Sequence, residues 1–215
     1  MALSRTRDVT GRPRRARGDR PGAAADPSGR GSDERDDPES VARLICLRLL
    51  TAAPRTQAEL ATALRRRGVP DEAAETVLAR FAEVKLIDDA TFSRAWVESR
   101  HHSRGLAGRA LGAELRRKGV AQDDITGALD ELDPGQELAT ARELVARRIP
   151  ATRGQPGPAR MRKLAGMLAR KGYGPALAYR VVREALEQEA AETGRPSHDL
   201  DGLEEPDAIE ELDGL

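Results

Sequence analysis

The residue types that usually carry out chemistry are few in this sequence of 215 residues, and their surroundings do not favour catalysis. The single cysteine, Cys46, lies in an apolar run, which favours a core thiol over a nucleophile. His101 and His102 have no third ligand at the spacing of a metal site, so we interpret them as a solvated helix end. Asp88 and Asp89 could form a carboxylate pair, but a helix N-cap explains them without further assumptions. We therefore predict a protein that is not an enzyme and has no catalytic residue, metal or cofactor.

Positive charge is the chemistry that does recur along the chain. Three basic clusters each end at a glycine: Arg65, Arg66 and Arg67 before Gly68; Arg116, Arg117 and Lys118 before Gly119; and Arg170 and Lys171 before Gly172. Arg104 and Arg109 precede the second cluster. We predict that these residues form a discontinuous basic line that contacts an anionic partner. The clusters could instead only stabilise helix ends, because cations in a last turn interact favourably with the helix dipole, and this alternative stays open.

The basic clusters belong to a pattern that occurs three times. Each copy has two leucines four residues apart, a glycine four residues after the second leucine, and then an apolar residue. The three sets are Leu60, Leu64, Gly68 and Val69; Leu111, Leu115, Gly119 and Val120; and Leu164, Leu168, Gly172 and Tyr173. The glycines lie 51 and 53 residues apart, which predicts repeated units of about 50 residues.

Helix signals predict three helices in each unit. The leucines mark the buried face of the middle helix, and the glycine is expected in a left-handed conformation just after that helix ends. Further apolar positions align across the units: Val41, Phe92 and Val145; Ile45, Trp96 and Ile149; Leu78, Leu129 and Val182. Because one such unit has only a small core, we predict an all-α, elongated and curved array of three three-helix repeats in tandem. The alternative is a compact nine-helix bundle in which the similarity arises by chance.

The formal net charge of zero conceals a segregation of charge. Residues 1–37 hold nine arginines and seven acids, whereas residues 190–215 hold nine acids and one base. Both segments lack the apolar content that offsets the entropy of ordering a chain, so we predict a disordered basic arm and a disordered acidic tail. The segment between them carries a net charge of +6. Its predicted units are 38–87, 88–133 and 134–189.

The composition excludes several classes of protein. Aromatic residues make up 2% of the chain, which argues against a β-sandwich or a β-barrel. One cysteine excludes a disulfide framework. The sequence has no apolar run of about 18 residues, and no apolar segment follows its N-terminal arginines. We therefore expect a cytoplasmic protein that makes no membrane contact.

The stretch 84–125 closely resembles the RecX family of regulatory proteins. The features that carry the resemblance are the acidic turn Ile87-Asp88-Asp89, the helix start at Phe92, the helix end Val97-Glu98-Ser99-Arg100, the turn at Gly105, and the motif from Leu111 to Val120. The likeness covers about 40–189 and is looser in the third unit. Ser93 departs from the alanine that the family usually has at this position.

This resemblance implies a non-catalytic regulator of the RecA recombinase, in DNA recombination, DNA repair and the SOS response. Family members lie along the groove of the RecA–DNA filament and mainly inhibit its ATPase, strand-exchange and coprotease activities. The partners would be the RecA filament and, without sequence specificity, the DNA phosphates, with the basic residues named above as candidate contacts and the chain as a monomer. A helix-turn-helix protein that acts on bare duplex DNA and a protein-interaction scaffold remain alternatives.

Overall fold

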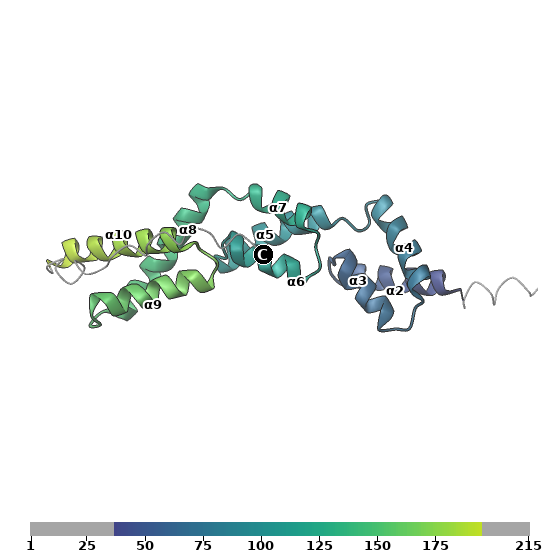
Figure 1. The fold of residues 1–215 in the computed structure, drawn as a ribbon, viewed down its shortest axis with the longest axis horizontal. Helices are drawn as coiled ribbons and strands as arrows, with labels where there is room; N and C mark the ends of the chain where they lie inside the picture. The colour runs from purple at the N-terminus through teal and green to yellow at the C-terminus, as the bar shows by residue number, and fades with distance from the viewer. Residues whose placement is uncertain (1–36, 195–215) are drawn as a thin grey trace, which may run out of the picture.

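The computed structural model describes residues 37–194. Within this range nine α-helices and one 3-10 helix form three successive groups, as Figure 1 shows. The first unit comprises α2 (Pro38–Ala52), α3 (Gln57–Arg65) and α4 (Asp71–Glu83); the second comprises α5 (Asp89–Arg104), α6 (Gly108–Arg117) and α7 (Gln122–Asp130); the third comprises α8 (Pro134–Arg148), η2 (Ile149–Thr152), α9 (Gly157–Arg170) and α10 (Pro175–Thr193). Residues 1–36 of the predicted basic arm and residues 195–215 of the predicted acidic tail lie outside the described residues.

Each unit has a hydrophobic core of its own. The paired leucines of the middle helices are fully buried, as predicted: Leu60, Leu64, Leu111, Leu115, Leu164 and Leu168. Extensive packing between helices stays within each unit across the described part of the chain. The units therefore form an extended row of small cores, the architecture predicted from the repeat, and not a compact bundle (Figure 1).

Local chemistry accounts for the helix starts that position the basic clusters. Asp37 and Asp88 are the N-caps of α2 and α5, and each carboxylate accepts a hydrogen bond from the backbone N–H three residues later. Thr56 and Glu59 form a capping box at the start of α3. The sequence thus specifies where α3 begins. Because each residue of a helix turns by a fixed angle, the start also determines the side of α3 on which the basic residues of its last turn lie.

In the first two units the aligned apolar positions Val41 and Phe92 lie one residue away from the buried face of the first helix. Val41 is 36% exposed, whereas Ala42 and Cys46 are fully buried. In the second unit Ser93 is fully buried, and Phe92 packs only at the edge of the core. At these positions the small side chains of Ala42, Cys46 and Ser93 face the core, and the larger side chains of Val41 and Phe92 lie beside them. The large apolar residues alone therefore indicate a helix face that is rotated away from the buried one.

A buried hydroxyl in α5 gives a first test of this packing. Ser93 Oγ has no hydrogen-bond partner among the described residues. Because an unpaired buried hydroxyl destabilises the folded state, we expect Ser93→Ala to raise the free energy of unfolding by about 1 kcal/mol. Urea unfolding followed by helical circular dichroism measures this change. A less stable variant would show that the hydroxyl is satisfied in solution.

The last helix extends into the predicted acidic tail. α10 ends at Thr193, although the tail was predicted to begin at residue 190. Ala190, Ala191 and Glu192 favour helix, and Gly194 then ends it in a left-handed conformation with φ of 65°. The predicted boundary rested on charge balance, which does not determine where a helix ends.

A buried carboxylate joins α10 to α9 and to the segment that precedes α9. The Glu189 side chain is 11% exposed, and Nε of Arg153 donates to its Oε1 at 2.7 Å. Arg160, which is equally buried, donates to the other oxygen. Burial favours the protonated acid, but the hydrogen bonds from the two arginines outweigh it and hold the pKa of Glu189 below its ordinary value.

This pKa shift predicts a pH dependence of stability. A lowered pKa in the folded state contributes stability above the unfolded pKa, near 4.5, and that stability is lost as the pH falls through the folded pKa. Glu189→Gln is expected to destabilise the third unit by about 2 kcal/mol at neutral pH, because Arg160 then stays buried without a carboxylate. Denaturant unfolding at pH 7 and pH 4 should show a smaller loss of stability on acidification for the variant. An equal loss in both proteins would contradict this role.

Candidate nucleic-acid interface

The middle helices join neighbouring units through one contact that occurs twice. The turn after α6 packs against the start of α3, where Thr56 Oγ1 donates to the carbonyl oxygen of Lys118 at 2.7 Å. The turn after α9 packs against the start of α6, where the N–H of Ala107 donates to the carbonyl oxygen of Lys171 at 2.9 Å. Thr56 and Ala107 are the N-cap residues of their helices. The repeat therefore extends from the units to the contacts between them.

This contact gives two of the repeated glycines a second role. Gly68, Gly119 and Gly172 have φ values of 75°, 77° and 93°, the left-handed conformation predicted from the sequence. A Cβ at Gly119 would lie 2.4 Å from the Cβ of Ala58, and one at Gly172 would lie 2.4 Å from the backbone nitrogen of Ala110. At Gly68 a Cβ would meet no described atom within 4 Å. Gly119 and Gly172 are thus required for close approach as well as for the turn.

The lysines before these glycines help to connect the units. Nζ of Lys118 donates to Glu59 Oε1 at 2.7 Å and lies 4.4 Å from the ring centre of Trp96. Nζ of Lys171 donates to the carbonyl oxygen of Arg104. Both lysines were predicted to contact a partner. The structure gives them an additional role at the junctions, which the sequence pattern did not reveal.

An aromatic pair fixes the position of Lys118. Trp96 stacks on Phe92 with ring centres 5.6 Å apart, and the Arg100 guanidinium lies 4.2 Å from the ring centre of Trp96. Trp96 Nε1 donates to Glu114 Oε2 at 2.9 Å. The Lys118 ammonium is thereby held between an aromatic ring and a carboxylate at the junction of the first two units.

A basic pocket with a volume of about 560 Å³ lies at this junction. Its charged lining consists of six basic side chains and one carboxylate: Arg55, Arg66, Arg67, Arg116, Arg117, Lys118 and Glu59. Nε of Arg55 is buried and has no hydrogen-bond partner within the described part of the chain. Such a concentration of cations suits the phosphate groups of a nucleic acid.

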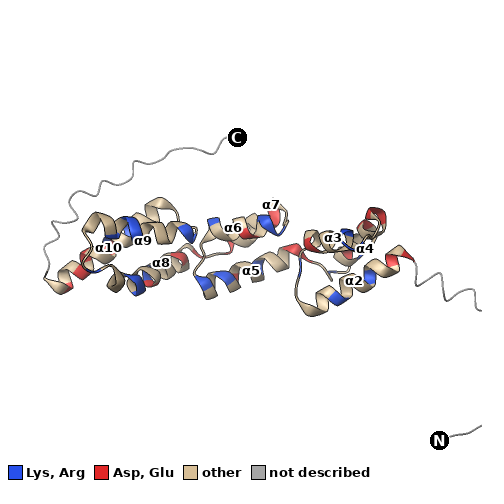
Figure 2. Cartoon of the chain, turned by 90° about the horizontal axis from the view of Figure 1, so that it is seen from below, with Lys and Arg blue, Asp and Glu red and all other residues tan. Residues whose placement is uncertain are grey.

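Five of the predicted contact residues line the basic pocket, and the others lie elsewhere. Arg65 forms an exposed ion pair with Asp71 at 3.7 Å. Arg104, Arg109 and Arg170 are exposed, and Lys171 is half-buried. Basic residues nevertheless recur in each of the three units, as Figure 2 shows. The clusters of the first and second units meet, whereas the third cluster stays separate from the pocket.

Arg55 is the pocket residue that the sequence pattern missed. It is a lone arginine that precedes the N-cap Thr56, outside every basic cluster. Arg55 lies in the connection between α2 and α3. The hydrogen bond from Thr56 to the second unit brings this connection to the junction, so the position of Arg55 depends on tertiary structure. The one available signal was its place beside a capping box.

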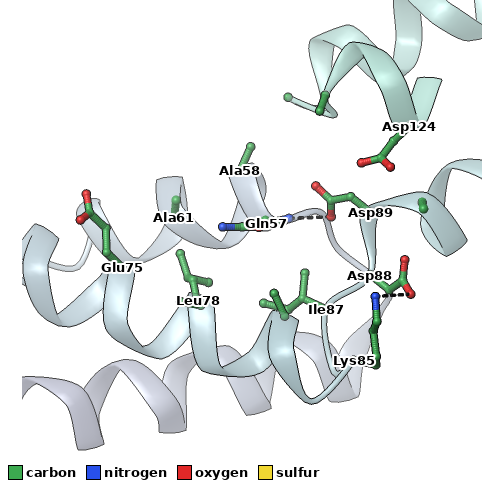
Figure 3. Close-up of a pocket in the computed structure, with 15 residues that line it drawn as sticks. Gln57, Ala58, Ala61, Glu75, Leu78, Lys85, Ile87, Asp88, Asp89 and Asp124 are labelled. Carbon is green, nitrogen blue, oxygen red and sulfur yellow. Dashed lines mark hydrogen bonds and ion pairs between the residues drawn. The ribbon is translucent and has the colours of Figure 1, made fainter. Parts of the chain in front are cut away.

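An acidic pocket of about 730 Å³ borders the same contact and shares Ala58 and Gly119 with the basic pocket. Its carboxylates belong to Glu75, Asp88, Asp89 and Asp124. In Figure 3 Asp89 and Asp124 face one another across the junction, and Asp89 accepts a hydrogen bond from the Gln57 N–H at 3.0 Å. Burial raises the pKa of Asp89 more than this hydrogen bond lowers it, and the Asp124 carboxylate raises it further. An anion is therefore attracted to only one of the two pockets.

The residues first considered for chemistry do not form a reactive site. Cys46 is buried as predicted, and burial raises the pKa of its thiol. His102 is exposed at the helix end, as interpreted, but for His101 the interpretation is wrong, because it is buried: its Nδ1 lies 2.8 Å from the carbonyl oxygen of Leu106 and its Nε2 lies 3.1 Å from Thr140 Oγ1. Thr140 belongs to α8, so this histidine at the end of α5 contacts the next unit. The described residues contain no group of three or more His, Cys, Asp or Glu side chains that could hold a metal ion.

Three family models match successive parts of the chain. They describe the first three-helix domain of RecX at residues 42–81, the second at 88–129 and the third at 135–182. The chain belongs to the RecX family. The resemblance seen in the second unit is thereby confirmed, and each matched RecX domain coincides with one of the three helical groups.

Curated RecX relatives match most of the chain. Regulatory protein RecX of Thermobifida fusca is 59% identical over 167 residues, which are 78% of this chain and 90% of that protein. Regulatory protein RecX of Streptomyces coelicolor is 60% identical over 157 residues, which are 73% of this chain and 84% of that protein. Membership of this RecX family identifies the chain as a regulatory protein.

Two crystal structures of RecX proteins share the fold. One, a regulatory protein RecX, has a TM-score of 0.64 at 23% identity and covers 76% of this chain and 80% of its own. RecX from Lactobacillus salivarius has a TM-score of 0.65 at 16% identity and covers 69% of this chain and 96% of its own. In the described part of this RecX-family chain, no helix is long and apolar enough to span a membrane.

Proposed function

We propose that this RecX-family chain binds the RecA–DNA filament and inhibits its ATPase, strand-exchange and coprotease activities without catalysing a reaction itself. The observation that carries the proposal is the basic pocket at the junction of the first two units of a RecX fold. Six basic side chains from two units converge there. The chain would act as a monomer in the cytoplasm.

The pocket is the proposed point of contact with DNA phosphates. Arg55, Arg66, Arg67, Arg116 and Arg117 would neutralise phosphates without reading the base sequence, so binding would weaken as salt is added. Lys118 is held at the pocket by Glu59 and Trp96. The predicted residues outside the pocket, Arg65, Arg104, Arg109, Arg170 and Lys171, would contact DNA or RecA further along the row.

The extended shape supports a partner that is itself repetitive. Separate cores in a row present a surface much longer than one unit, so the chain could contact several subunits of a helical filament at once. Several weak contacts on one partner then act as a single tight one. If the chain binds best to a filament conformation that hydrolyses ATP slowly, it increases the population of that conformation. The ATPase activity of the filament then falls although the chain catalyses no reaction.

Binding to a preassembled filament tests the proposal. The chain is mixed with RecA on single-stranded DNA in the presence of a slowly hydrolysed ATP analogue, and filaments are sedimented. We expect the chain to sediment with the filament and to dissociate as the salt concentration rises. A sequence-specific footprint on bare duplex DNA would instead support a helix-turn-helix regulator. Salt-insensitive binding to another protein, with none to RecA or DNA, would support a scaffold.

A further inference from the structure

An apolar groove of about 530 Å³ lies in the first two units, and the proposed contact with DNA phosphates does not use it. It runs between the end of α2, the connection of residues 84–88 from α4 to α5, and the first half of α5. Leu86, Phe92 and Trp96 contribute to its apolar lining. Val84 and Leu86 of the connection are 64% and 46% exposed. Exposed apolar side chains beside a hollow are typical of a surface that binds another molecule.

The acidic pocket adjoins this groove, because Lys85, Ile87 and Asp88 line both hollows. Four carboxylates and one lysine line the acidic pocket, and that lysine already pairs with Asp88 at 3.7 Å. Glu75 and Asp124 have no ion-pair partner among the described residues. In Figure 3 Asp124 lies toward the end of the pocket that holds Lys85 and Asp88, and Glu75 lies at the other end. The apolar groove therefore continues into a hollow whose carboxylates are available to cations.

The chemistry of these two hollows suits a protein segment and not a nucleic acid. Carboxylates repel phosphate groups. The Trp96 ring stacks on Phe92 and lies close to the cations of Arg100 and Lys118, so little of its face is left for a nucleobase. A protein segment can place a large apolar side chain in the groove and a lysine or arginine in the acidic pocket, which matches the surface in both polarity and charge.

The basic pocket borders both of these hollows. It shares Arg55 with the groove, and it shares Ala58 and Gly119 with the acidic pocket. A surface suited to phosphates and a surface suited to a protein segment therefore meet at one junction between units. A chain that holds DNA phosphates in the basic pocket brings the groove beside the protein that coats that DNA.

We propose that the apolar groove and the acidic pocket together form the docking surface for the protein subunits of the filament. The segment that docks carries a large apolar side chain next to lysine or arginine. This assignment rests on the proposed function, and it divides the junction into a DNA contact in the basic pocket and a protein contact beside it. Because the two contacts act on one partner, the chain binds the filament more tightly than it binds bare DNA.

The apolar half of the surface is tested by Leu86→Ser in the full-length chain. We expect this variant to bind the RecA filament about tenfold more weakly than the wild type in sedimentation, because an apolar contact with the protein is lost. Its affinity for bare single-stranded DNA, measured by fluorescence anisotropy, should not change. The matched control is Leu44→Ser, because Leu44 is 69% exposed on α2 and lines neither hollow. Equal filament binding by the two variants would overturn the proposal.

The acidic half is tested by neutralising two carboxylates together, as Glu75→Gln with Asp124→Asn. The matched control is Asp123→Asn with Asp130→Asn, which removes the same charge from α7 outside both hollows. Both pairs should bind bare DNA equally well, since their net charges are the same. The pocket pair alone is expected to bind the filament about fivefold more weakly. Filament affinities that do not differ between the two pairs would contradict a cationic segment in the acidic pocket.

A photoreactive label identifies directly what covers the groove. Cys46 is the only cysteine of the chain and is fully buried, so a thiol-reactive benzophenone attaches at residue 86 in the folded Leu86→Cys variant. On illumination of the assembled filament we expect a covalent link to RecA. The same label in Arg66→Cys, at the basic pocket, should link to DNA instead. A link from residue 86 to DNA or to a second copy of the chain would overturn the proposal.

The proposed function and the docking surface fail in different ways. If the wild type sediments with the filament and the Leu86 and acidic-pocket variants bind it equally well, only the docking surface is refuted. Losses of the same size on bare DNA and on the filament would also refute it, because the groove would then serve the DNA contact. If the wild type binds neither the filament nor DNA, the proposed function is refuted, and the docking surface with it.

Discussion

Gly172→Ala is expected to disrupt the junction of the second and third units, whereas Gly68→Ala should be tolerated. Both glycines are left-handed, with φ values of 93° and 75°, so both alanines carry some backbone strain. At Gly172 the added Cβ would also lie 2.4 Å from the backbone nitrogen of Ala110, and a helix backbone cannot move aside cheaply. We expect a loss of about 1 kcal/mol at Gly68 and of about 3 kcal/mol or more at Gly172.

The pair of variants is its own control, because the substitution and the turn are the same and only the neighbouring unit differs. Urea unfolding followed by circular dichroism gives the two free energies. Equal losses at Gly68 and Gly172 would show that the left-handed turn alone matters. The close contact between units would then contribute nothing to stability.

The second large effect is expected from the basic pocket. Reversing the charge of Arg66 and Arg117 together should weaken binding to DNA and to the RecA filament by about 100-fold at moderate salt, because two cations become two anions beside the phosphates. The slope of log affinity against log salt should fall by about two. Both side chains are exposed, so the helical circular dichroism should not change.

Arg170 supplies the comparison, because it occupies the equivalent position in the third unit but lies outside the pocket. Arg170→Glu alone should weaken binding much less than the double change, and adding it to the double change should have only a small further effect. If all three reversals together leave DNA and filament affinity at the wild-type value, the basic clusters only stabilise helix ends.

Much of the fold follows from local chemistry in the sequence. The capping box at Thr56, the N-cap at Asp88 and the left-handed glycines are each determined by residues within one or two helical turns. The buried leucines follow from the period of the middle helix. In the first helix of the first two units the aligned large apolar residues do not mark the buried face, because small residues such as Ala42 and Ser93 are buried there instead.

The site was predictable only in part, because its remaining features depend on contacts between distant residues. The hydrogen bond between Thr56 and Lys118 joins residues 62 positions apart, and no local pattern indicates it. The same contact brings Arg55 to the pocket and gives Lys118 its role between the units. His101 was misjudged for the same reason, because Thr140, which covers it, lies 39 residues away. The basic clusters themselves were visible, since they accompany the repeat.

The most direct test of the central claim is the DNA-dependent ATPase activity of RecA, measured while the purified full-length chain is titrated in. We predict that the wild type suppresses ATP hydrolysis at or below a stoichiometric ratio to RecA, and that the double reversal at Arg66 and Arg117 requires far more protein for the same effect. Unchanged ATP hydrolysis at a stoichiometric excess of the wild type, in moderate salt, would contradict the account.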